Sequence, residues 1–143
     1  MIKSILLPVD LNDESSWRKA LPQAVDLVRF YNAKLHVLTV IPDYGMSIVG
    51  SYFPKGFSEK AKQETEVALK DFVSENIPDG IDVAYSVLHG AIYKEILAQA
   101  EVTNCDLIVL SSHRPEMKDY LLGPNAARIV RHARQSVFVV REG

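Results

Sequence analysis

Short apolar runs alternate with stretches of helical periodicity, and this order restricts the possible folds more than any other feature. Residues 5–9, 107–110 and 137–140 are continuous apolar runs, as in strands buried on both faces of a parallel sheet. Weaker runs rich in Val and Leu cover residues 35–40 and 82–88. Between the runs, apolar residues recur every three or four positions at 17–28, 61–73, 92–100 and 126–133. The chain therefore predicts an open parallel α/β sandwich with right-handed crossovers.

Capping and turn residues limit these helices. Ser58 is the expected N-cap of the second helix, and Pro78 and Gly80 follow its expected end. Pro22 lies inside the first helical pattern, so it should kink that helix or restrict its regular part to the residues that follow.

Two connections are longer than usual, which is typical of functional or disordered segments. They cover residues 41–57 and 112–123. The aromatic residues of the first connection could form a lid over a planar ligand or a packing surface against the domain or a second subunit.

Composition narrows the class of protein. The 143 residues are 48% hydrophobic and 24% charged, which predicts one globular domain over residues 1–143. A net charge of -2 argues against general binding to nucleic acid or to an anionic membrane. No segment approaches the length of an apolar membrane span, and we expect a cytoplasmic protein. The single cysteine, Cys105, is expected to be a buried structural thiol, with a reactive thiol as the alternative.

A doubly wound sheet binds ligands beyond the carboxyl ends of its strands, where the strand order reverses. This rule points to Asp10, after the first strand, and to residues 111–114, after the fourth. The Asp10 carboxylate could accept hydrogen bonds from a ribose or join a hydrated Mg²⁺. Alternatively it could cap the first helix, although Asn12 and Asp13 are also available for capping.

The segment from Ser111 to Ala126 runs from a strand end into a helix start and suits an anion. From Ser111 onward six Lys and Arg face three Asp and Glu, whereas the rest of the chain holds ten against fifteen. Arg114 lies in the loop itself. We interpret the three later arginines as a solvated helix face; they are Arg128, Arg131 and Arg134. His113 has no partner at a catalytic spacing, so nothing in the sequence predicts acid–base catalysis.

The chain resembles the universal stress protein family over its whole length. The resemblance rests on residues 5–10, 35–40, 89–90 and 107–113, on Leu122-Gly123, and most specifically on 129–133 with 136–140. It implies a five-stranded sheet in the order 3-2-1-4-5 with helices on both faces. It also implies a homodimer and, as in many members, ATP bound between strands one and four.

In such members Asp10 would meet the ribose or, indirectly, a Mg²⁺ ion, and Val40 would offer its backbone to adenine. The loop from Ser111 to Asn125 would hold the ribose and the phosphates. ADP or AMP could replace ATP. The residues expected at the nucleotide are Pro8, Val9, Asp10, Val40, Ser111, Ser112, His113, Arg114, Gly123, Pro124 and Asn125.

The loop departs from the family pattern G-x2-G-x9-G-[ST]. Ser111 and Arg114 replace the first two glycines, eight residues separate Arg114 from Gly123, and Pro124 replaces the Ser or Thr. The loop instead resembles a short-loop sub-branch, Ser-His-Arg-Pro to Leu-Leu-Gly-x-Asn-Ala. Losing one hydrogen bond to a charged group costs about 1.5 to 3 kcal/mol, or roughly ten- to hundredfold in affinity. Arg114 could compensate as a phosphate ligand.

Two functions follow as hypotheses. The first is an ATP-binding, dimeric stress-response or regulatory sensor with at most slow ATP hydrolysis, acting on a regulatory partner that the sequence does not identify. The alternative is a nucleotide-free dimeric interaction module, its loop degenerate at Ser111, Arg114 and Pro124. In both, the dimer would form through an apolar edge strand. Its residues are Val137, Phe138, Val139 and Val140.

Overall fold

The computed structural model describes residues 1–42, 55–112 and 124–141. Its centre is a parallel sheet in the order β3-β2-β1-β4-β5, which confirms the expected topology. The strands are β1 (Ser4–Pro8), β2 (Lys34–Pro42), β3 (Val83–Gly90), β4 (Leu107–Ser112) and β5 (Ser136–Arg141).

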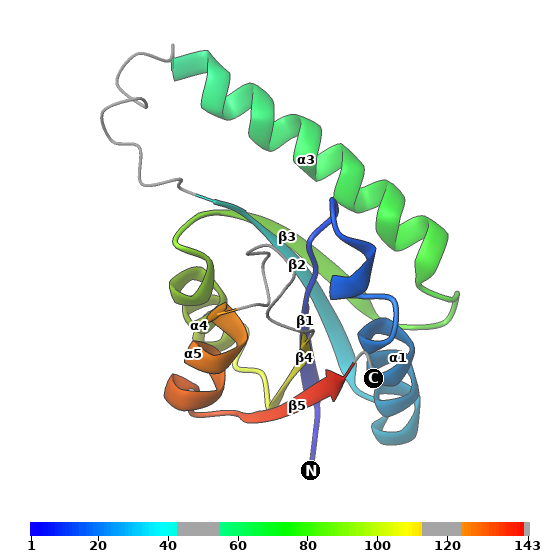
Figure 1. Cartoon of the computed structure of the whole chain (residues 1–143). Coiled ribbons are helices and arrows are strands. Elements are labelled where there is room, and N and C mark those ends of the chain that lie inside the picture. Colours follow the sequence, from blue (N-terminus) through cyan, green and yellow to red (C-terminus); the bar gives the residue numbers. More distant parts are fainter. Residues whose placement is uncertain (43–54, 113–123, 142–143) are drawn as a thin grey trace.

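Helices cover both faces of the sheet (Figure 1). A short 3-10 helix, η1 (Glu14–Ser16), precedes α1 (Ala20–Tyr31). The other helices are α3 (Lys55–Asn76), α4 (Ile92–Val102) and α5 (Pro124–His132). Helices α1 and α3 pack on one face, and α4 and α5 pack together on the other. Of the helices in the described ranges, none is long and apolar enough to cross a membrane.

The central strands contribute to a core on each face because successive strand residues point to opposite sides. Ile5 and Leu7 of β1 pack with α1 and α3, whereas Leu6 between them packs with α4 and α5. In β4, Val109 joins the first core, and Ile108 and Leu110 join the second. Continuous apolar runs are therefore required in these strands, as the sequence predicted.

Two helix starts differ in detail from expectation. The Ser58 N-cap prediction is wrong, because α3 begins at Lys55 and places Ser58 inside the helix. Pro22 is the third residue of α1, so the helix begins two residues before it rather than after it. A proline is tolerated there because first-turn N–H groups have no partner within the helix. The turn after α3 is as expected, with Gly80 at a φ of 89°.

Cys105 lies just before β4, and its expected burial is confirmed. Burial raises the pKa of its thiol to about 11, so the reactive thiolate is scarce at neutral pH.

A histidine beneath α4 makes stability depend on pH. His36 Nε2 lies 2.9 Å from Ser86 Oγ and 3.4 Å from Gln99 Nε2. Burial lowers the pKa of His36 below its ordinary value of 6.5, and the charge of Lys34 lowers it further. Between that lower pKa and 6.5, the unfolded chain binds more protons than the folded one. The contribution of His36 to the free energy of unfolding should therefore be fully present above pH 6.5. It should decrease as the pH falls from 6.5 to the lower pKa.

The prediction is that His36→Gln flattens the dependence of the unfolding free energy on pH just below 6.5. Urea denaturation at several pH values measures it. The same change at His89, which is exposed at the end of β3, should leave the slope as in the wild type. Equal slopes for His36→Gln and the wild type would contradict the prediction.

Candidate functional site

The site is defined by where two neighbouring strands end. Strands β1 and β4 lie side by side, with Ile5 and Leu6 in register with Leu107 and Ile108. The chain leaves β1 toward α1 on one face and leaves β4 toward α5 on the other. The strand order therefore reverses between them, which is where open α/β sheets bind ligands.

Asp10 follows β1 in a tightly bonded turn. The Asp10 backbone N donates to Ser16 Oγ at 2.9 Å, and Ser16 Oγ donates to the Asp10 carbonyl at 3.1 Å. Ser16 is only 1% exposed, so this pairing satisfies buried groups. The Asp10 Oδ1 accepts a hydrogen bond from the backbone N of Asn12 at 3.0 Å. The turn holds the carboxylate at the carboxyl edge of the sheet.

A residue other than Asp10 provides the side-chain cap after β1. Asp13 is the N-cap of η1, and its Oδ1 accepts hydrogen bonds from the backbone N and the hydroxyl of Ser15. Lys19 is the N-cap residue of α1 and makes no side-chain cap. Asp10 therefore caps neither helix.

Strand β2, which contains Val40, continues beyond the end of its neighbour β1. The last register pair between β1 and β2 is Pro8 with Leu38, after which Val9 N donates to Leu38 O at 2.8 Å. Lys34 N likewise bonds toward β1, at Lys3 O, whereas Leu35 N bonds toward β3, at Asp82 O. Peptide groups of even-numbered residues in β2 thus face β1. The N–H and C=O of Val40 face the side on which β1 has ended.

Pro8 and Val9 are both buried beside these groups. Their side chains form part of the protein interior below the edge, where an apolar floor would lie under a planar ligand.

The two serines that end β4 point to opposite faces of the sheet. Ser111 is 2% exposed, and its hydroxyl donates to the Ser15 carbonyl at 2.9 Å, on the side of η1 and α1. Ser112 has the same parity as Ile108 and Leu110, so it lies on the face of α4 and α5 and is half-buried. Of the two hydroxyls, that of Ser112 is the one placed toward α5.

Helix α5 begins with Pro124, followed by a half-buried Asn125 and a buried Ala126. Its first turn holds no acidic residue, so the positive end of the helix dipole is not neutralised from within that turn. The first-turn N–H groups of Asn125 and Ala126 have no acceptor within the helix. The predictions made for His113, Arg114 and Gly123, and for an aromatic lid in the first long connection, lie outside the described residues.

A further cation borders this edge and was missed from the sequence. Arg141, the last residue of β5, is in register with Ser112 and is exposed. Neighbouring strands lie about 4.8 Å apart, so Arg141 is at the same level of the sheet as the serine. The signal was present, since Arg141 directly follows the apolar run of the last strand just as Ser111 follows that of the fourth.

No group of three or more His, Cys, Asp or Glu side chains able to hold a metal occurs within residues 1–42, 55–112 and 124–141. Mg²⁺ is often held by one or two carboxylates, with waters and substrate phosphates completing its shell. A single carboxylate at the edge, that of Asp10, fits such an ion when it arrives with a phosphate ligand.

Fold and site together define a doubly wound α/β domain whose polar groups gather at the strand-order reversal. The family model described as "Universal stress protein family" matches residues 1–141, and the chain belongs to this family. It is 30% identical over 143 residues to universal stress protein G of Shigella flexneri, covering 99% of this chain and all of that protein.

Solved structures share the fold. Universal stress protein UspA from Lactobacillus plantarum has a TM-score of 0.71 at 20% identity and covers 98% of both chains. A universal stress protein in complex with cAMP has a TM-score of 0.61 at 21% identity, covering 99% of this chain and 98% of that one. One from Archaeoglobus fulgidus in complex with dAMP has a TM-score of 0.62 at 15% identity and covers 98% of both.

Proposed function

We propose that this chain binds an adenine nucleotide, ATP with Mg²⁺, between β1 and β4 and acts as a dimeric stress-response or regulatory sensor. The proposal is supported by the strand-order reversal between β1 and β4: Asp10 follows the first of these strands, Ser112 ends the second, and α5 is the next helix after it. Two structures of the same fold contain adenine nucleotides, cAMP in one and dAMP in the other. ADP or AMP would use the same groups.

The base would be read by the backbone of Val40. Adenine presents a donor and an acceptor on one edge, and the C=O and N–H of Val40 face the side left open by β1. A backbone pair of this kind recognises the hydrogen-bonding edge of the base without any polar side chain. The buried Pro8 and Val9 would lie beneath the base.

The anionic part of the nucleotide would lie toward α5. The Ser112 hydroxyl and the N–H groups of Asn125 and Ala126 supply donors, and the helix dipole favours negative charge there. Arg141 adds a cation beside Ser112. Asp10 would accept from the ribose or contact a hydrated Mg²⁺. His113, Arg114 and Gly123 would complete the loop, as their place in the sequence suggests.

A nucleotide-free interaction module is the second candidate. Two observations favour it: the Ser111 hydroxyl is bonded to Ser15, and Pro124 lacks an N–H at the helix start. In either function we expect at most slow ATP hydrolysis, because no described group is placed to activate water beside a phosphate.

The two serines give a matched test by calorimetric titration of the nucleotide-stripped protein with Mg-ATP. Ser112→Ala should weaken ATP binding about ten- to hundredfold, because it removes a hydrogen bond to a charged group. Asp10→Ala should weaken it comparably. Ser111→Ala should leave affinity within about threefold while lowering the free energy of unfolding by about 1 to 3 kcal/mol, since the Ser15 carbonyl loses its partner.

Absence of heat with millimolar Mg-ATP would support the interaction module instead. Equal losses of affinity in Ser111→Ala and Ser112→Ala would contradict the assignment of the hydroxyls.

We also propose that two copies pair through β5. This strand ends the sheet order, so its outer N–H and C=O groups have no neighbouring strand in the part of the chain that the structure describes, and Phe138 on it is 39% exposed. A charge at Val139 should separate the copies, so Val139→Lys should be monomeric by light scattering. Val102→Lys changes an exposed valine on α4 and should remain dimeric. A monomeric wild type, or a dimeric Val139→Lys, would contradict the proposal.

A further inference from the structure

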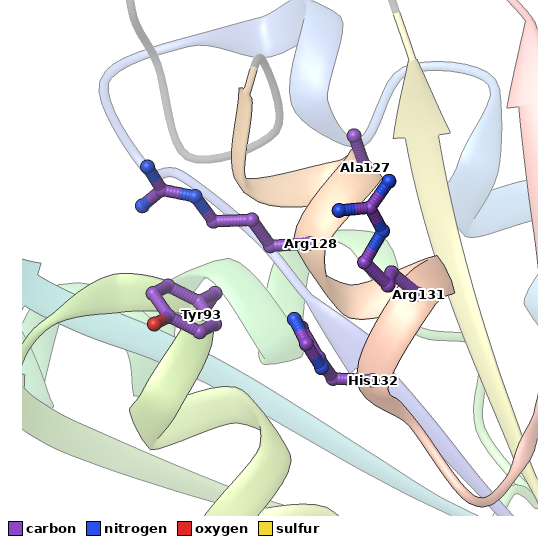
Figure 2. A pocket seen from close by; sticks show the side chains of 5 residues that line it. All are labelled: Tyr93, Ala127, Arg128, Arg131 and His132. Carbon is purple, nitrogen blue, oxygen red and sulfur yellow. The ribbon is translucent and has the colours of Figure 1, made fainter.

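A pocket lies between α4 and α5, and within the described ranges none of the residues placed at the sheet edge lines it. Its volume is about 550 Å³. Figure 2 shows Arg128 reaching from α5 toward Tyr93 of α4, with His132 beside Tyr93 and Arg131 pointing along α5 toward Ala127. The described lining is Tyr93, Ala127, Arg128, Arg131 and His132.

The aromatic ring of Tyr93 orients one of the cations. The guanidinium carbon of Arg128 lies 5.0 Å from the centre of the Tyr93 ring, within the range of a cation–π interaction. A cation–π contact is not a hydrogen bond, so it leaves the guanidinium N–H groups able to donate to an acceptor. A held arginine loses less side-chain entropy when it binds an anion.

The pocket lining lacks a negative partner among the described residues. Residues 124–141 contain four arginines and no Asp or Glu. On the facing helix, Glu101 pairs with Arg134 at 3.6 Å and accepts a hydrogen bond from Gln135 at 2.7 Å. Glu95 of α4 packs instead against Gly90, where an added Cβ would lie 3.0 Å from its Oε2. Neither carboxylate lines the pocket.

The helix dipole explains the positions of only some of the basic residues that line this pocket. Arg131 and His132 lie in the last turn of α5, where cations favour the negative end of the dipole. Arg128 lies in the middle of the helix and contacts a different helix, so the dipole does not explain it. Two guanidinium groups, an imidazole and a phenol around one space are all potential hydrogen-bond donors.

We infer that this pocket binds the phosphate group of a small phosphorylated ligand, at a site separate from the sheet edge. Guanidinium groups suit a dianionic phosphate because each can donate two parallel hydrogen bonds to its oxygens. The pocket volume lies within the range of small-molecule sites.

The test is a titration of the full chain with inorganic phosphate at constant ionic strength, monitored by the backbone amide signals in NMR spectra. Saturable shifts should centre on Tyr93 and on residues 127–132. Acetate, a monoanion, should bind more weakly, and phenyl phosphate should bind at least as tightly as phosphate if the body of the ligand also occupies the pocket. Shifts centred on Asn125 and Ala126 would place the anion at the sheet edge and overturn the inference, as would shifts that do not saturate.

Matched variants distinguish phosphate binding in the pocket from a general effect of the net charge of the protein. Arg131→Gln should weaken phosphate binding about tenfold, whereas Arg134→Gln, outside the lining, should change it by less than about twofold. Ala127→Glu places a carboxylate in the lining and should abolish binding, and Ala98→Glu on α4 should not. Equal effects within either pair would overturn the inference. Because all four positions are exposed, the variants should fold, which their NMR spectra would verify.

Discussion

Replacing Pro124 by serine is expected to tighten ATP binding about ten- to hundredfold. Pro124 is the first residue of α5 and supplies no backbone N–H at the end of the helix that faces the proposed phosphates. Serine would add both an N–H and a hydroxyl there. One hydrogen bond to a charged group contributes about 1.5 to 3 kcal/mol, which corresponds to the stated range in affinity.

Calorimetry with Mg-ATP measures the effect, and Pro22→Ser is its matched control. Pro22 also lies in the first turn of a helix, α1, and is exposed. Both changes should alter the unfolding free energy by less than about 1 kcal/mol through the flexibility of the unfolded chain. Only the change at Pro124 should alter affinity. Unchanged affinity in Pro124→Ser would argue that phosphates do not reach the start of α5.

Ile129→Ala should produce the largest loss of stability considered, about 2 to 5 kcal/mol. Ile129 has no exposed surface and joins α5 to the core shared with Leu6 and Ile108. Removing its side chain leaves a cavity beneath the helix that carries both Pro124 and the arginines of the pocket. Urea denaturation gives the free energy of unfolding.

The adjacent residue provides the control. Val130 is 52% exposed, so Val130→Ala should change the free energy of unfolding by less than about 0.5 kcal/mol. If both variants lost the same stability, the burial of α5 on the sheet would be in doubt. Ile129→Ala should also weaken phosphate and ATP binding, since both rely on the position of α5.

The centre of the sheet was predictable because β1 and β4 are buried on both faces and must be continuously apolar. That pattern in residues 5–9 and 107–110 does not depend on distant contacts. The start of α3 was harder to predict, because a serine can occupy a helix interior as well as an N-cap. Pro54, immediately before Lys55 in the sequence, was the better sign, since proline is common at helix starts.

The site was predictable by position but not by side-chain direction. The ends of the first and fourth strands identified Asp10 and the two serines, as the topological rule requires. The sequence could not show that the Ser111 hydroxyl donates to Ser15, because those residues are 96 positions apart. The register pairing of Arg141 with Ser112 likewise depends on how β5 aligns with β4, which a single sequence does not reveal.

The division of β4 between two cores also determines where this chain can tolerate a change in length. Inserting or deleting one residue between Leu107 and Ser112 would exchange the faces of every residue beyond it. The serine bonded to Ser15 would then turn toward α5, and its neighbour would turn away. An insertion after Ser112 leaves both hydroxyls in place. Relatives with longer or shorter connections at that point can thus share one strand geometry while differing in what the connection holds.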